Sequence, residues 1–222
     1  MTRKLICEAF GTFCLVFAGT GAIVVNNITH GAVTHVGISL TFGLIVLAMI
    51  YSIGEISGAH INPAVTLAFT IIRRFPLRHL VPYICAQLTG AIAASAVIRF
   101  LFPGDSTLGR TMPSGSVAQS LILEIVLSLI LMFVILMVST GAKEKSAIAG
   151  IAVGSIVALE ALFAGPISGA SMNPARSIAP ALISQHLHYS WIYLIAPIIG
   201  MAMAVPIAQT VISQKHPLQF ST

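Results

Sequence analysis

The sequence GEISGAHINPAVTLA at residues 54–68 occurs a second time, as GPISGASMNPARSIA at residues 165–179. The two stretches align without gaps, and nine of their fifteen positions are identical. Their asparagines, Asn62 and Asn173, lie 111 residues apart, which is half of the 222-residue chain. Self-similarity at a fixed spacing is the sequence signature of repeated structural units. The match therefore predicts two repeats, at about residues 1–110 and 114–222.

Each copy contains an Asn-Pro-Ala box that predicts the start of a short helix. Asn is a favourable N-cap residue, and Pro fits the first helical position because no N–H is needed there. The apolar stretches that begin at the boxes, 62–72 and 173–183, have eleven residues each. As helices they measure roughly 16 Å, about half of a ~30 Å hydrocarbon core. Two such half-spans that enter a membrane from opposite sides together make one span.

The rest of the chain has the composition of a polytopic membrane protein. Hydrophobic residues make up 57% of the chain and charged residues 8%, whereas soluble domains have about 25% charged residues. This composition excludes a typical soluble enzyme, a disordered protein and a disulfide scaffold. Six apolar segments have the length of a spanning helix: residues 5–25, 36–53, 80–102, 118–140, 147–164 and 190–212. We therefore expect one all-α transmembrane domain over residues 1–222.

The basic residues predict how the chain is oriented, because cytoplasmic loops carry an excess of Lys and Arg. Two arginines, Arg99 and Arg110, fall on one side of the membrane. Eight basic residues fall on the other side, at the N-terminus or after spans two, four and six: Arg3, Lys4, Arg73, Arg74, Arg78, Lys143, Lys145 and Lys215. We therefore expect both termini in the cytoplasm. The net charge of +5 is interpreted as topology and contact with membrane lipid, not as nucleic-acid binding.

Three spans in each half is an odd number, so the second half must enter the membrane upside down relative to the first. Inverted repeats place their sites near the midplane, where interrupted helices meet. At its two boxes the chain resembles the aquaporin, or major intrinsic protein, family. The stretch from Phe163 to Ser177 resembles the nodulin-26-like branch and its bacterial relatives in particular. The resemblance covers essentially the whole chain. It implies a channel in the plasma membrane that is not an enzyme, forms a homotetramer and holds no cofactor or metal.

The resemblance implies that the two boxes meet at the centre of a pore. The positive ends of two helix dipoles then oppose cations and protons, and the asparagine amides donate hydrogen bonds to a passing solute. The boxes consist of Asn62, Pro63, Ala64, Asn173, Pro174 and Ala175. The irregular loops before them are expected to line the pore with carbonyl groups. These carbonyls belong to Gly58, Ala59, His60, Ile61, Gly169, Ser171 and Met172.

A selectivity filter is the second implication of the resemblance, and it consists of Phe42, Ala161, Ala170 and Arg176. Arg176 also stands out by itself, because an arginine in an apolar membrane segment is expensive and is a functional hypothesis by default. Water-selective relatives have a histidine where this chain has Ala161. One aromatic residue, two alanines and one arginine leave a wider opening. That opening favours small neutral polyols or metalloid hydroxides (arsenous, boric or silicic acid) together with water.

Two glutamates, Glu8 and Glu124, lie in the first span of each half. The resemblance implies that each accepts hydrogen bonds from the backbone of a re-entrant loop, and the alternative is a proton relay. Glu55 is expected in the loop before the first box. Neither Glu55 nor Glu160 receives a role from the sequence.

Other functions stay open at this point. A water-selective pore is one. An ion-coupled secondary transporter is another, because inverted repeats and interrupted helices also occur in transporters. A transporter needs an ion site, usually a charged group at the midplane, where this chain has Asn62 and Asn173 instead. A membrane protease would need a Ser/His or paired-Asp arrangement, which the box region lacks.

Overall fold

The structure, a computed structural model, describes residues 1–140 and 148–213, and these residues form helices and no strands. Six helices are long and apolar enough to cross a membrane. They are α1 (Thr2–Ile28), α2 (Thr34–Ser57), α4 (Leu80–Leu101), α5 (Val117–Val138), α7 (Ala149–Ser168) and α9 (Ser190–Ser213). Three shorter helices are α3 (Pro63–Ile71), η1 (Leu77–His79) and α8 (Pro174–Ile183). The predicted all-α fold of six spans and two half-helices is confirmed.

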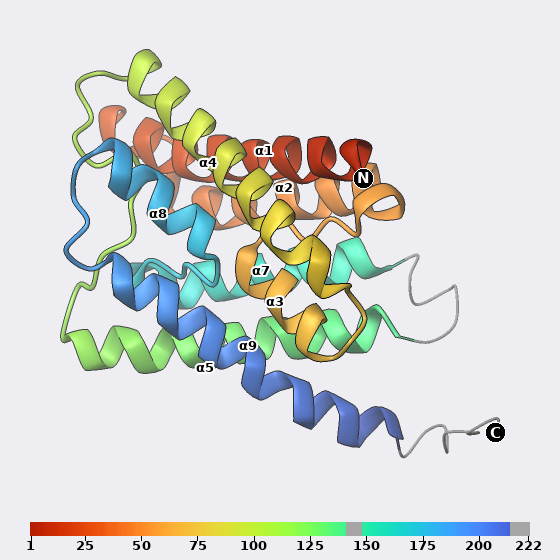
Figure 1. Cartoon of the computed structure of the whole chain (residues 1–222). Helices are drawn as coiled ribbons and strands as arrows, with labels where there is room; N and C mark the ends of the chain where they lie inside the picture. Colours follow the sequence, from red (N-terminus) through yellow and green to blue (C-terminus); the bar gives the residue numbers. More distant parts are fainter. Residues whose placement is uncertain (141–147, 214–222) are drawn as a thin grey trace, which may run out of the picture.

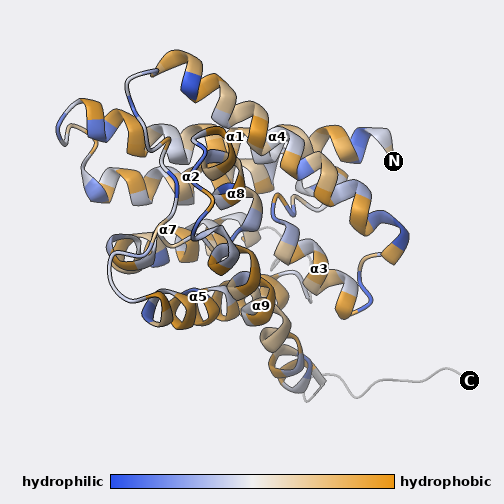
Figure 2. Ribbon diagram, turned by 60° about the vertical axis from the view of Figure 1, so that its left-hand side comes forward, coloured by the Kyte–Doolittle hydropathy of each residue, from blue (hydrophilic) through white to orange (hydrophobic). Residues whose placement is uncertain are grey.

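The long helices form two groups of three, and the half-helices lie between the groups (Figure 1). In the first group α1 packs against α2 and α4, and in the second α5 packs against α7 and α9. Helices α2 and α7 pack against each other and join the groups. Each half-helix, α3 or α8, packs against both α4 and α9. Hydrophobic residues cover much of the long helices, as expected for surfaces in contact with lipid (Figure 2).

Glycines allow the closest helix pairs to touch backbone to backbone, which is a common way for helices to associate in lipid. A Cβ atom on Gly90 of α4 would lie 1.9 Å from the carbonyl oxygen of Ala9 in α1. A Cβ atom on Gly200 of α9 would lie 2.2 Å from the carbonyl oxygen of Ile125 in α5. The same contact thus occurs once in each half of the chain.

Helices α2 and α7 continue to Ser57 and Ser168, past the predicted ends at residues 53 and 164. The expectation that Glu55 lies in a loop is wrong: Glu55 is an exposed residue within α2. Helix α7 even contains Pro166, whose missing N–H leaves the carbonyl four residues earlier without its helical partner. That carbonyl belongs to Leu162, and the His35 ring donates to it from Nε2 at 2.6 Å. A side chain from α2 therefore replaces the backbone bond that the proline removes.

The two ends of the bundle differ in charge. The N-terminus, the loop after α3 and the C-terminal end of α9 lie at one end, and the loop between α4 and α5 lies at the other (Figure 1). The first end carries five of the predicted cytoplasmic basic residues, namely Arg3, Lys4, Arg73, Arg74 and Arg78. The other three, Lys143, Lys145 and Lys215, lie outside the described residues.

Candidate functional site

Both half-helices begin at an asparagine that caps its own helix. Asn62 Oδ1 accepts a hydrogen bond from the Ala64 N–H at 2.9 Å, and Asn173 Oδ1 accepts one from the Ala175 N–H at 3.0 Å. Both asparagines have extended backbone, which is the usual N-cap conformation. The cap bonds use the side-chain oxygens and leave the amide Nδ2 groups to point away from their helices.

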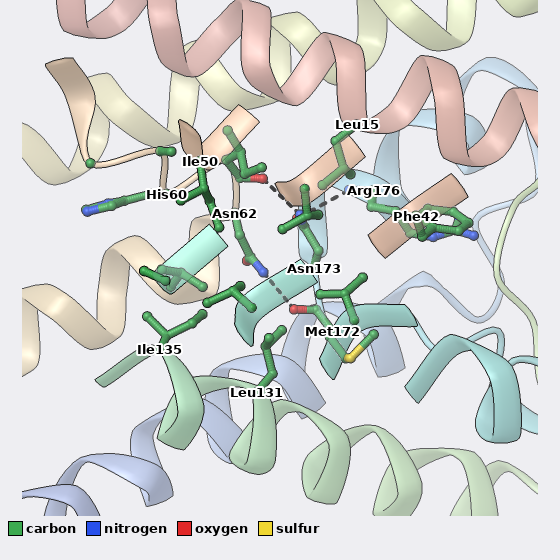
Figure 3. Close-up of a pocket in the computed structure, with 18 of the residues that line it drawn as sticks. Leu15, Phe42, Ile50, His60, Asn62, Leu131, Ile135, Met172, Asn173 and Arg176 are labelled. Carbon is green, nitrogen blue, oxygen red and sulfur yellow. Dashed lines mark hydrogen bonds between the residues drawn. The ribbon is translucent and has the colours of Figure 1, made fainter. Parts of the chain in front are cut away.

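The two boxes contact each other through these Nδ2 groups. Asn62 Nδ2 donates to the carbonyl oxygen of Met172 at 2.8 Å, and Asn173 Nδ2 donates to that of Ile61 at 2.9 Å (Figure 3). Each box is therefore completed by the loop of the other half. An amide group carries two N–H donors, so each asparagine has one donor beyond this bond.

Glu8 of α1 is a fully buried acceptor for the loop before the first box. Its carboxylate accepts from the backbone N–H groups of His60 at 3.0 Å and Ile61 at 2.7 Å. Side chains supply two more donors, Ser57 Oγ and Gln87 Nε2, both at 2.8 Å. These four bonds satisfy a carboxylate that would otherwise be costly to bury.

Glu124 of α5 holds the second loop in the same way. It accepts from the backbone N–H groups of Ser171 and Met172, both at 2.9 Å, and from Ser168 Oγ at 2.7 Å. Like Glu8, it has no exposed surface. The carboxylates bind the protein's own backbone and do not line the cavity described below.

These bonds determine which way the loop carbonyls point. In a trans peptide the carbonyl points opposite to the N–H of the next residue. The N–H groups of His60 and Ser171 face the glutamates. The carbonyls of the preceding residues, Ala59 and Ala170, therefore face away from them. Alternate loop residues also have a left-handed backbone, with φ of 46° and 40° at these alanines and 42° and 52° at Ile61 and Met172. Such conformations cost of order 1–3 kcal/mol each and persist only where surrounding bonds enforce them.

A cavity of about 140 Å³ passes between the two groups of helices and reaches both boxes (Figure 3). Asn62 and Asn173 line it, as do residues 58–61 and 170–172 of the loops. Most of the remaining lining is apolar and comes from the long helices and α3: Leu15, Phe42, Val46, Ile50, Val65, Phe69, Leu131, Ile135, Val138, Val153 and Val157. The lining therefore combines a few polar groups, from the boxes, the loops and Arg176, with a larger apolar part from the helices.

Gly169 was expected to contribute a pore carbonyl, but it does not line this cavity. It ends α7 with a left-handed φ of 90°, and its Cα faces Thr111, so that a Cβ atom there would lie 2.8 Å from Thr111 Cγ2. The Pro and Ala residues of the boxes are also absent from the lining. They are buried as the first turns of α3 and α8 and position the asparagines.

The four predicted filter residues line the same cavity. They come from four places: Phe42 from α2, Ala161 from α7, Ala170 from the second loop and Arg176 from α8. The Arg176 guanidinium carbon lies 4.9 Å from the centre of the Phe42 ring, a cation–π distance. Its Nη1 donates to the carbonyl oxygen of Gly109 at 2.8 Å. Arg176 is only 2% exposed, and its Nε has no hydrogen-bond partner among the described residues.

Sequence reasoning missed several contributors to this site. The Gly109 anchor is a backbone carbonyl, and no residue type in the sequence signals such an acceptor. The His60 side chain was also not foreseen: it is buried and stacks on Phe69, with ring centres 4.9 Å apart. Its Nδ1 lies 3.2 Å from Thr66 Oγ1. Glu160 is 1% exposed, outside the cavity lining, and neither of its oxygens has a partner in the described part of the chain.

Comparison with known proteins identifies the family to which the chain belongs. The family model described as "Major intrinsic protein" matches residues 1–207. The chain belongs to the major intrinsic protein family. As a member of that family it is similar to Aquaporin NIP1-1 of Zea mays, with 47% identity over 89% of this chain and 71% of that protein. It is also similar to Nodulin-26 of Glycine max, with 41% identity over 99% of this chain and 82% of that protein.

The similarity extends to solved structures. The X-ray structure of the aquaglyceroporin from Plasmodium falciparum superimposes with a TM-score of 0.85 at 27% sequence identity, covering 96% of this chain and 98% of that chain. The predicted aquaporin resemblance and its relation to nodulin-26-like proteins are thereby confirmed. This major intrinsic protein is an integral membrane channel for water and small solutes.

Proposed function

We propose that this channel passes small uncharged solutes, namely glycerol-like polyols and metalloid hydroxides such as arsenous, boric or silicic acid, together with water. The observation that carries the proposal is the set of residues around Arg176. Two of the other three, Ala161 and Ala170, are alanines, so no side chain beyond Cβ narrows the opening on their sides. The fold also superimposes on a protein that is described as an aquaglyceroporin.

The mixed lining of the cavity suits such solutes. A polyol carries hydroxyl groups together with C–H surface. Its hydroxyls can donate to the loop carbonyls and accept from Asn62, Asn173 and Arg176, while its C–H groups face the apolar part of the lining. Pore selectivity of this kind depends on the hydrogen-bond groups that line the path and on its width.

We propose that ions and protons are excluded electrostatically. Each half-helix presents its N-terminus to the cavity, with about half a positive charge from the helix dipole. Arg176 adds a full positive charge at the filter. Among the described residues that line the cavity there is no Asp or Glu. A cation would therefore find no counter-charge along this path.

Two rival functions make different predictions for transport. A water-selective pore would pass water and no glycerol. An ion-coupled transporter would need a charged group at its central site, and the groups that meet between the half-helices are the amides of Asn62 and Asn173. The apolar part of the lining favours a solute channel over a water-selective pore, and the lack of carboxylates among the described lining residues favours it over a coupled transporter.

We further propose that the protein lies in the plasma membrane. Its termini are in the cytoplasm, an orientation that the distribution of basic residues supports. The chain forms one domain over residues 1–222, built from repeats at about 1–110 and 114–222. It assembles as a homotetramer with one pore in each subunit and has membrane lipid, water and small neutral solutes as its partners. No cofactor or nucleic acid is part of this proposal.

The direct test replaces Ala161 with histidine, which adds an imidazole ring to the lining of the cavity that Arg176 also lines. We expect Ala161→His to lower the ratio of glycerol to water permeability about tenfold, equivalent to ~1.4 kcal/mol of added barrier. The measurement is stopped-flow light scattering of proteoliposomes under water and glycerol gradients. Ala161→Ser, which keeps the residue small, is the control and should retain the wild-type ratio. Wild-type vesicles that pass water but no glycerol would contradict the proposed solute range.

A further inference from the structure

The carbonyl that anchors Arg176 lies in the loop between α4 and α5, residues 102–116. The bond from Arg176 Nη1 to Gly109 is the one side-chain hydrogen bond that this guanidinium makes within the described residues. Gly109 has a left-handed φ of 65° and is pressed against α1, where a Cβ atom would lie 2.8 Å from the Thr20 carbonyl oxygen. The position of the Gly109 carbonyl therefore determines where the guanidinium stands in the filter.

The turn that leads to Gly109 is organised by Asp105, which is only 7% exposed. Its Oδ1 accepts from the backbone N–H groups of Thr107 at 2.7 Å and Leu108 at 2.8 Å, and from Thr107 Oγ1 at 2.7 Å. Its Oδ2 accepts from Asn27 Nδ2, at the end of α1, at 3.1 Å. Asp side chains commonly fold a turn by accepting from the backbone two residues on.

Neighbouring contacts fix this turn to the rest of the molecule. Arg99 of α4 donates from Nη1 to the Asp105 carbonyl oxygen at 2.9 Å. Leu108 has a left-handed φ of 51° and is fully buried in a cluster with Val24 and Ile98. Left-handed backbone is unfavourable for leucine, so the bond from its N–H to the Asp105 carboxylate helps to maintain it. The Asp105 side chain thus determines the path of the chain as far as Gly109.

We propose that Asp105 is a positioning residue for the selectivity filter. Its carboxylate sets the turn that delivers the Gly109 carbonyl to Arg176. Asp105 does not line the cavity, so it acts on solutes only through this carbonyl. Without the turn, the guanidinium loses its anchor and projects into the opening, where it obstructs a polyol more than water. This inference deepens the proposed function and rests on it.

The test compares Asp105→Ala with two matched variants in proteoliposomes. Asp105→Asn keeps an oxygen that can accept from the two turn N–H groups. Ser106→Ala changes the exposed neighbouring side chain, which has no hydrogen bond within the described residues. We expect Asp105→Ala to lower the ratio of glycerol to water permeability about fivefold to tenfold, as loss of one hydrogen bond would. Asp105→Asn and Ser106→Ala should keep the wild-type ratio.

The ratio does not depend on how much protein is folded, so a purely structural role for Asp105 would leave it unchanged. A wild-type ratio in Asp105→Ala would overturn the inference. If Asp105→Ala does not fold, Thr107→Val removes the hydroxyl bonds of the same turn and should give an intermediate ratio. A wild-type ratio of glycerol to water permeability in Thr107→Val would then overturn the inferred positioning role of Asp105.

The outcome also separates this inference from the proposed function. If wild-type vesicles pass water alone, the solute assignment fails, and water permeability per folded protein becomes the readout. A lower water permeability in Asp105→Ala, with wild-type water permeability in Asp105→Asn and Ser106→Ala, would support the positioning role. Equal water permeability in all four proteins would overturn it.

Discussion

At the scale of single residues, the most buried charges of the pore region bind the protein's own backbone. Glu8 and Glu124 accept from the loop N–H groups, and the carbonyls of Ala59 and Ala170 therefore face away from these acids. Among the described residues that line the cavity, Arg176 is the one with a charged side chain. The acids therefore position the loops, and under the proposed function Arg176 selects among solutes.

Replacing Glu124 with glutamine should destabilise the protein. One carboxylate oxygen becomes an NH₂ group, which faces a backbone N–H or the Ser168 hydroxyl where an acceptor is needed. We expect a loss of about 1–3 kcal/mol in the free energy of unfolding, the cost of an unsatisfied buried group. Thermal unfolding in detergent measures it. The same change at exposed Glu55 is the control, and equal melting temperatures for the two variants would argue against this role.

Asp105 should make stability depend on pH. Burial raises its pKa, but hydrogen bonds from Thr107, Asn27 and the Leu108 backbone outweigh burial and hold the pKa below its ordinary value. A lowered pKa contributes stability that is present above the unfolded-state value of about 4 and is lost as pH falls through the folded-state value. The melting temperature of wild type should therefore exceed that of Asp105→Asn at about pH 6, and the difference should shrink below about pH 4. A difference that stays constant over this range would refute the assignment.

At the scale of elements, two helix pairs, α1 with α4 and α5 with α9, approach backbone to backbone at glycines. The contact of α4 with α1 at Gly90 has its counterpart at Gly200, where α9 meets α5. Lipid tails are as apolar as the helix surfaces, so burying apolar side chains between helices gains little over contact with lipid. Close backbone packing at the glycines therefore stabilises these pairs.

Gly90→Ala should disrupt the pairing of α1 and α4. The new methyl group would overlap the Ala9 carbonyl oxygen, and backbone cannot move aside as a side chain can. We expect destabilisation of about 3 kcal/mol or more, at the upper end for overpacked cores. Size-exclusion profiles and thermal unfolding in detergent report it. Gly104→Ala, where no atom lies within 4 Å of the new methyl, should behave as wild type.

The sequence predicts the elements well and their ends less well. Apolar length identifies all six spans, and the Asn-Pro signal places the start of both half-helices. The end of α7 could not be foreseen, because Pro166 is compensated by His35, a residue 127 positions away from Leu162 in the chain. The four predicted filter residues could be named from the family resemblance at the boxes, and all four line the cavity. Their anchor at Gly109 could not be named in this way, because any residue type offers the same carbonyl.

At the scale of the whole molecule, the cavity lies between two groups of helices, and the paired boxes line it. The cavity offers a solute hydrogen bonds, an apolar wall and no negative charge from the described residues. Under the proposed function, a solute crosses this cavity without a coupled ion.

Solute flux should therefore depend on the solute gradient alone. We expect glycerol uptake into proteoliposomes to stay the same when a proton or sodium gradient is imposed, in either direction. A pH-sensitive dye inside the same vesicles should report no proton flux above that of protein-free vesicles. Accumulation of glycerol against its own gradient would show instead that the protein is a coupled transporter.

The two hydrogen bonds between the boxes are symmetric, so they do not distinguish the two sides of the channel. The bond from Asn62 to Met172 becomes the bond from Asn173 to Ile61 when each residue is replaced by its counterpart in the other half. Such an exchange is self-complementary, like the isologous interface of a two-fold dimer, so the centre looks the same from either face. Polarity enters through parts that break the symmetry: Arg176, whose counterpart is Val65, and the connector that supplies Gly109. Arg176 lies in the second copy of the duplicated stretch and Gly109 in the connector between α4 and α5. Under the proposed function, the two sides of the channel therefore differ because the copies have diverged at this position and because one connector reaches the filter.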